Sequence, residues 1–164
     1  MITLTGFMGS GKTTVGKVLA DFLGCPFMDL DELIVKKAGK SIPDIFAQDG
    51  EAAFRQLEAR ILRQQVEKYA ESTVVLALGG GAVLAPASAA LLHEKTVCIY
   101  LRASLETLLA RLAGETAGRP LADDAIAERL AAREPLYEET AHVIVDTDGL
   151  SPDEVADEII ITAL

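Results

Sequence analysis

The sequence predicts a three-layer α/β domain, in which helices cover both faces of a parallel sheet. Short apolar runs alternate with segments of helical spacing along the whole chain. Several of these runs are almost continuously hydrophobic, as expected for strands buried on both faces of a parallel sheet. The length of 164 residues suits a single domain, 1–164, and 50% hydrophobic residues are enough for its core.

Five apolar runs are predicted to form the strands. They are Ile2–Thr5, Pro26–Asp29, Thr73–Leu78, Thr96–Leu101 and His142–Asp146. Helical spacing fills the gaps, most clearly in 15–23, where Gly24 ends the helix and Pro26 prevents its return. Further apolar stripes lie in 54–61, 105–112 and 155–160. This alternation implies right-handed crossovers between parallel strands.

Composition argues against several classes of partner. The net charge of −10 speaks against nucleic acid, because proteins that bind it usually have a basic face. No apolar run approaches the roughly 20 residues that span a bilayer, so no membrane partner is expected. A strand pattern begins at once, so no signal peptide is expected. Cys25 and Cys98 lack metal-ligand spacing and fit a reducing, cytoplasmic setting.

The strongest motif is Gly6–Thr13, which reads G-F-M-G-S-G-K-T and fits the P-loop pattern. It follows a predicted strand and opens an amphipathic helix, as a phosphate-binding loop does. Glycines let the backbone N–H groups converge on phosphate oxygens, and the helix N-terminus adds positive potential. We expect Lys12 to reach the β- and γ-phosphates of ATP and Thr13 to offer its hydroxyl to Mg²⁺.

Two carboxylates lie at the end of the second predicted strand. Asp29 and Asp31 are two residues apart, so on a strand they would face the same side, at the edge where α/β sheets bind ligands. Asp29 is the expected metal-side carboxylate, and Asp31 can accept the proton of an attacking hydroxyl. The alternative is that Asp31 only caps the helix that follows.

Arginines and a glycine run are the remaining candidates. Arg55, with Glu58 three residues on to hold it, and Arg133 suit bidentate binding of a carboxylate, although either can be an ordinary surface residue. Gly79–Gly81 follows a strand, where glycine permits close approach of a ligand or simply forms a tight turn.

The segment 113–124 contains two glycines, a proline and little apolar periodicity. It is interpreted either as a plain surface loop or as a mobile lid over the active site. In the second case Arg119 would close over the transferred phosphate, and Arg111, just before the segment, would lie against the adenine ring.

With these motifs in hand, the whole chain resembles the shikimate kinase family, in the nucleoside monophosphate kinase-like branch of P-loop folds. The resemblance rests on Gly6–Thr13, Phe27–Asp31, Asp49–Glu51 with Phe54, Arg55 and Glu58, Leu78–Val83, Arg119–Leu121 and Arg133–Tyr137. It implies a five-stranded parallel sheet in the order 2-3-1-4-5, an acceptor-binding helical region at about 31–62 and a lid at about 113–124.

The resemblance also implies a role for each candidate residue. ATP would be bound by Gly9, Ser10, Gly11, Lys12, Thr13, Thr14, Arg111, Arg119 and Pro120, and shikimate by Asp31, Arg55, Gly79, Gly80, Gly81 and Arg133. Thr13 and Asp29 would support Mg²⁺. Lys12, Asp31 and Arg119 would be catalytic. Asp146–Gly149 would lie on the adenine side.

The reaction implied is transfer of the γ-phosphate of MgATP to the 3-hydroxyl of shikimate, in aromatic amino acid biosynthesis. The family also implies a cytoplasmic monomer whose partners are the small molecules ATP and shikimate. Two other readings stay open from the residues alone. One is another small P-loop kinase, for gluconate or a nucleotide; the other is an ATP-binding module without turnover.

Overall fold

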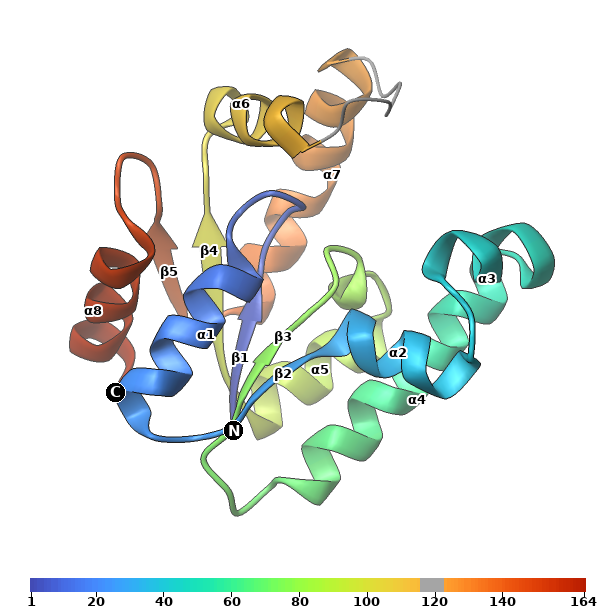
Figure 1. Cartoon of the computed structure of the whole chain (residues 1–164), viewed down its shortest axis with the longest axis horizontal. Coiled ribbons are helices and arrows are strands. Elements are labelled where there is room, and N and C mark those ends of the chain that lie inside the picture. The colour runs from blue at the N-terminus through green and yellow to red at the C-terminus, as the bar shows by residue number, and fades with distance from the viewer. Residues whose placement is uncertain (116–122) are drawn as a thin grey trace.

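A five-stranded, wholly parallel sheet forms the centre of the chain, in the order β2-β3-β1-β4-β5. The computed structural model describes residues 1–115 and 123–164 (Figure 1). The strands are β1 (Ile2–Thr5), β2 (Phe27–Asp29), β3 (Val75–Ala77), β4 (Val97–Arg102) and β5 (Val143–Asp146). This confirms the predicted α/β class and the strand order that the resemblance implies.

Helices cover both faces of this sheet and extend beyond one edge of it (Figure 1). They are α1 (Lys12–Leu23), α2 (Leu30–Ala38), α3 (Ile42–Asp49), α4 (Glu51–Lys68), α5 (Pro86–Lys95), α6 (Leu105–Glu115), α7 (Asp123–Thr140) and α8 (Pro152–Ala163), with a short 3₁₀ helix, η1, at Ala82–Leu84. Helix α1, which crosses from β1 to β2, packs beside α8, which follows the last strand, on one face of the sheet. From β2 onward the crossovers run in the opposite direction along the sheet, so α4, α5 and α7 cover the other face.

Alternation along the strands divides the core into two apolar clusters. Leu4, Ile99 and Val145 point to the face covered by α1 and α8, where they pack with Val15 and Ile159. Leu76, Cys98 and Tyr100 point to the opposite face and pack against α4, α5 and α7. Successive side chains of a strand face opposite sides, so β3 and β4 supply residues to both clusters.

The predicted strands are right in number and place but too long at several ends. Thr73 is exposed before β3, and Leu78 lies beyond its last residue. The prediction that Asp29 and Asp31 share a strand is wrong, since β2 ends at Asp29 and α2 begins at Leu30. The Asp29 carboxylate accepts from the N–H of Asp31 at 2.9 Å and of Glu32 at 3.4 Å, so Asp29 is the N-cap of α2.

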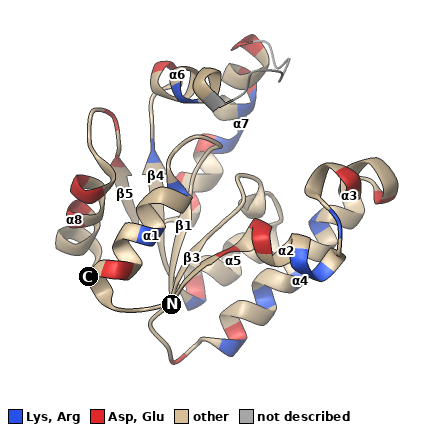
Figure 2. Cartoon of the chain, in the orientation of Figure 1, with Lys and Arg blue, Asp and Glu red and all other residues tan. Residues whose placement is uncertain are grey.

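The segment proposed as a lid is partly helical at both ends. Helix α6 continues to Glu115 and α7 begins at Asp123, so helix occupies positions predicted to belong to the loop. Arg119 and Pro120 lie outside the described residues. In the rest of the chain no helix is long and apolar enough to cross a membrane. Figure 2 shows that acidic residues recur along α8, whereas α4 carries both basic and acidic residues.

Candidate active site

The P-loop connects β1 to α1 at the carboxyl edge of the sheet (Figure 1). Gly11 has φ of 94°, in the left-handed region, and immediately precedes the first residue of α1. Glycine adopts this conformation without strain, so the backbone can curl and enter the helix within one residue. The loop and the N-terminus of α1 therefore form the phosphate cradle that the motif predicts.

Lys12 is half-buried at the start of α1, with its side chain folded back over the loop. Its ammonium donates to the carbonyl oxygens of Gly6 at 2.8 Å and Phe7 at 2.9 Å. Burial lowers the pKa of Lys12 to about 8, although the charges of Asp31 and Asp29 act to raise it. The ammonium is thus held in a place where added negative charge would favour its protonated form.

Thr13 and Asp29 meet on the β2 side of the loop. The Thr13 hydroxyl donates to Asp29 Oδ2 at 2.8 Å, while Asp29 Oδ1 caps α2. One carboxylate thereby joins the start of α1 to the start of α2. A hydroxyl and a carboxylate oxygen are both ligands suited to Mg²⁺, directly or through water.

Asp31 lies in the first turn of α2 and lines a cavity between α2, α4 and the end of β3. Burial, followed by the nearby charge of Asp29, raises the pKa of Asp31, against the opposing effect of Lys12 and Arg55. Helical geometry rather than strand alternation therefore orients this carboxylate. The alternative that Asp31 is a helix cap is wrong, because Asp29 fills that position.

Arg55 and Glu58 form an ion pair one turn apart on α4. Arg55 Nη1 donates to Glu58 Oε1 at 2.8 Å, which confirms the predicted support. Glu58 is buried, and burial raises the pKa of its carboxyl despite the hydrogen bond from Arg55. Arg55 Nε is buried and has no hydrogen-bond partner among the residues that the structure describes, where the nearest carboxylate oxygen of Glu51 is 3.9 Å away, so the guanidinium retains a donor.

The Gly79–Gly81 segment follows β3 and lies against these charged groups. A Cβ on Gly81 would overlap the Arg55 guanidinium, and one on Gly79 would lie 2.9 Å from Asp31 Oδ1. A side chain at either position would displace one of these charged groups, so with glycine the backbone itself forms the wall of the cavity. These contacts favour the interpretation that Gly79–Gly81 allows a ligand to approach the backbone closely, over the alternative of a plain tight turn.

This acceptor cavity has a volume of about 360 Å³. It is lined by Met8, Asp31, Ile42, Phe46, Phe54, Arg55, Glu58, Gly79, Gly80, Gly81, Arg129 and Arg133. The structure therefore brings together all six residues predicted to bind the acceptor, from α2, α4, α7 and the glycine segment. Three guanidinium groups, beside the buried Glu58 and the half-buried Asp31, suit a small ligand with both a carboxylate and hydroxyl groups.

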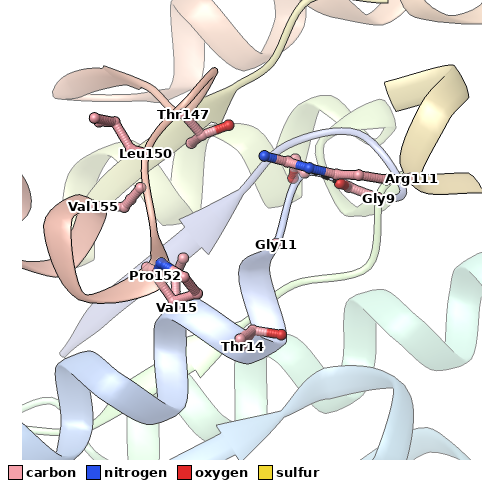
Figure 3. A pocket seen from close by; sticks show the side chains of 10 residues that line it. Gly9, Gly11, Thr14, Val15, Arg111, Thr147, Leu150, Pro152 and Val155 are labelled. Carbon is pink, nitrogen blue, oxygen red and sulfur yellow. Dashed lines mark hydrogen bonds between the residues drawn. The ribbon is translucent and has the colours of Figure 1, made fainter. Parts of the chain in front are cut away.

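A second cavity, of about 330 Å³, lies on the other side of the P-loop between α1, α6 and the start of α8. Gly9, Ser10, Gly11 and Thr14 line one end, while Leu150, Pro152 and Val155 form an apolar wall opposite (Figure 3). Arg111 reaches from α6 and donates to the Gly9 carbonyl at 3.1 Å. Thr147 also lines this cavity, within the stretch expected on the adenine side.

Sequence reasoning missed the apolar residues of both cavities. Ile42 and Phe46 lie on α3, a helix that was not predicted although Ser41 and Pro43 are a recognisable start signal. Pro152 and Val155 belong to a helix that was predicted, and Leu150 lies just before it, but no local pattern indicates that the first turn of this helix faces the P-loop.

Comparisons with known proteins agree with this geometry. The model of the shikimate kinase family matches residues 8–163. Shikimate kinases from Geobacter sulfurreducens and Enterococcus faecalis are 46% and 42% identical, over 96% and 97% of this chain and 87% and 95% of theirs. The structure of shikimate kinase from Acinetobacter baumannii in complex with shikimate superposes with a TM-score of 0.89 at 35% identity, covering 97% of this chain and 89% of that one.

The fold alone is shared more widely. A sugar kinase from Janibacter has a TM-score of 0.61 but is only 19% identical, so that likeness shows the fold alone. The family model and the curated relatives cover nearly the whole chain, including both cavities. The chain belongs to the shikimate kinase family.

Proposed function

We propose that this chain transfers the γ-phosphate of ATP to the 3-hydroxyl of shikimate, giving shikimate 3-phosphate and ADP. The supporting observation is that two cavities of different chemistry meet at one P-loop. Gly9 and Gly11 line the donor cavity, whereas Met8 lines the acceptor cavity. A phosphoryl group held at the loop is therefore within reach of a ligand on the other side.

The acceptor would be held by its carboxylate and its hydroxyl groups. Arg55 and Arg133 supply the positive charge, and a planar guanidinium can bind a carboxylate through two parallel hydrogen bonds. Glu58 keeps Arg55 in place through the 2.8 Å bond. The backbone of Gly79, Gly80 and Gly81 would contact the hydroxyl side of the ring.

ATP would occupy the cavity beside α6, with its phosphates in the loop. The backbone of Gly9–Thr14 and the Lys12 ammonium would neutralise phosphate charge, while Arg111 and the apolar wall would enclose the adenine. Arg119 and Pro120, outside the described residues, are proposed to complete this side, as part of a lid at about 113–124 that excludes water.

Mg²⁺ fits the residues beside the P-loop. No group of three or more His, Cys, Asp or Glu side chains able to hold a metal occurs in the described parts of the chain. Mg²⁺ bound together with nucleotide phosphates needs only one or two protein groups. Thr13 and Asp29, already in contact at 2.8 Å, would supply them. When bound, the ion neutralises charge on the phosphates.

Asp31 would act on the attacking hydroxyl. Its carboxylate lines the acceptor cavity and lies near the charge of Lys12. From there it can orient the hydroxyl and accept its proton as the oxygen bonds to phosphorus and ADP leaves. Positioning and charge neutralisation supply most of the acceleration in such transfers, so the base need not be strong.

An assay of ADP release against a panel of acceptors tests this function. We expect ADP and shikimate 3-phosphate in equal amounts, and little ADP with gluconate, a nucleoside monophosphate or no acceptor. ADP release that ignores shikimate would refute the proposal, and nucleotide binding without turnover would support the module reading instead. We also propose that the protein is cytoplasmic and monomeric. A dimer in size-exclusion chromatography with light scattering would contradict the monomeric state.

A further inference from the structure

Tyr137 is a buried residue of α7 that contacts the acceptor cavity only indirectly. Its side chain is 0% exposed and packs in the core, 5.0 Å from the ring of Tyr100. Its hydroxyl donates a hydrogen bond to the carbonyl oxygen of Gly80, 57 residues away in the chain. Burial raises the pKa of Tyr137 to about 12, so the hydroxyl stays a donor at neutral pH.

The carbonyl of Gly80 and the N–H of Gly81 belong to one planar, trans peptide unit. They point in opposite directions, so the bond from Tyr137 on the core side turns the N–H of Gly81 away from the core. The N–H groups of Gly80 and Gly81 have no hydrogen-bond partner within residues 1–115 and 123–164. Both residues line the acceptor cavity, where a ligand oxygen can accept from them.

Gly80 lies close to both α7 and the P-loop. A Cβ on Gly80 would lie 3.5 Å from Arg133 Nη1 and 3.5 Å from the backbone nitrogen of Met8. The glycine is therefore packed between α7 and the P-loop. Arg133 and Tyr137 are four residues apart and share a face of α7, so one helix presents both the guanidinium and the hydroxyl.

We propose that Tyr137 is a positioning residue for the acceptor: its hydroxyl fixes the 80–81 peptide so that the Gly81 N–H is aimed at an oxygen of the bound ligand. This rests on the proposed function of the cavity. Hydrogen bonding at the carbonyl also polarises the peptide and strengthens its N–H as a donor. Removing the hydroxyl would free the peptide and weaken acceptor binding, with no direct effect on ATP.

The test compares Y137F with the matched variant Y100F, in which the neighbouring buried ring loses its hydroxyl. We expect about a tenfold rise in the KM for shikimate in Y137F, equivalent to about 1.4 kcal/mol, with the KM for ATP within about twofold of wild type. In Y100F both values should stay within about twofold. Equal rises in both KM values, an unchanged shikimate KM in Y137F, or the same effect in Y100F would overturn the assignment.

Two measurements separate this role from others. The first is the double variant. If Tyr137 acts through Gly80, Y137F should raise the KM for shikimate by the same factor in an R133A background as in the wild type. If Tyr137 acts through Arg133, this rise should disappear in the R133A background. In the wild type, amide exchange of Gly81 followed by NMR should slow on adding shikimate, a readout that does not depend on how Y137F folds; unchanged exchange would count against the proposal. Wild-type turnover of shikimate is measured first, because its absence would refute the proposed function itself.

Discussion

At the scale of single residues, the charges in the acceptor cavity and the P-loop determine one another's ionisation. Burial disfavours the charged form of Lys12 and of Asp31, while their opposite charges attract and partly compensate. Bound phosphate would add negative charge next to Lys12. Substrate binding and proton binding should therefore be linked at this residue.

ATP binding should take up a proton at Lys12. With a pKa of about 8, the lysine is about half protonated at pH 8, and phosphate raises the pKa, so MgATP binding should take up about half a proton. Calorimetry in buffers of different ionisation enthalpy measures this. Above pH 8 the affinity for MgATP should also fall, by a factor that approaches about tenfold per pH unit. K12R is the control, because arginine stays charged; equal proton uptake in K12R would contradict the assignment.

Asp31→Asn should lower turnover but stabilise the fold at neutral pH. The folded-state pKa of Asp31 is raised, so ionising it costs stability as pH rises from the unfolded pKa through the folded one. Asparagine removes that cost, which is absent below the unfolded pKa of about 3.9. Urea denaturation of the wild type and of Asp31→Asn, at pH 7 and below pH 4, measures the difference. We expect the free energy of unfolding of Asp31→Asn to exceed that of the wild type only at pH 7. A loss of stability at pH 7 would disagree with the raised pKa.

Arg133→Ala should weaken shikimate binding by about 2–5 kcal/mol, the range for truncating one partner of a buried charge pair. Arg133→Lys should recover only part of this, because an ammonium cannot form two parallel bonds to a carboxylate. Calorimetric titration with shikimate measures both. Arg63→Ala is the control, since Arg63 is exposed on α4 and does not line the acceptor cavity. Unchanged affinity in Arg133→Ala would remove Arg133 from the site.

At the scale of secondary structure, caps determine what the sequence could and could not predict. The apolar pattern located every strand, but it could not show that the Asp29 side chain would bond to the N–H groups of Asp31 and Glu32. That bond starts α2 two residues earlier than a strand carrying both carboxylates would allow. Helix α3 was missed although the sequence shows where it begins. Ser41 and Pro43 are clear start signals, but the helix is short and spans only Ile42–Asp49.

Asp29 should have separable roles as cap and as metal-side carboxylate. Asp29→Ala should lower the free energy of unfolding by about 1–2 kcal/mol, because the N-terminus of α2 loses its acceptor. Asp29→Asn keeps an acceptor oxygen and should cost much less, yet it removes the charge beside Thr13. Urea denaturation and MgATP binding distinguish the two effects. We expect both variants to bind MgATP weakly; an Asp29→Ala variant as stable as wild type would show that the cap contributes nothing.

At the scale of the whole molecule, the strand order brings distant segments to one edge of the sheet. Because β1 lies between β3 and β4, the P-loop has the Gly79–Gly81 segment on one side and the start of α6 on the other. Periodicity predicts strands but not their order, which came here from the resemblance. For the same reason no local signal pointed to the bond between Tyr137 and Gly80.

Two cavities on opposite sides of one loop predict two separable ligand effects on the unfolding temperature. A ligand at 100 times its dissociation constant stabilises the folded state by about 2.7 kcal/mol, which for a domain of this size raises the Tm by about 5–10 °C. Shikimate and MgATP should each do so in the wild type, and their combined effect should be close to the sum. In Arg133→Ala the shift with shikimate should fall to about a third or less at the same shikimate concentration, as expected for an affinity loss of about 2–5 kcal/mol, and the shift with MgATP should be kept. Arg111→Ala, which alters only the donor cavity, should weaken the MgATP shift alone. Loss of both shifts in either variant would mean that the two ligands do not occupy separate cavities.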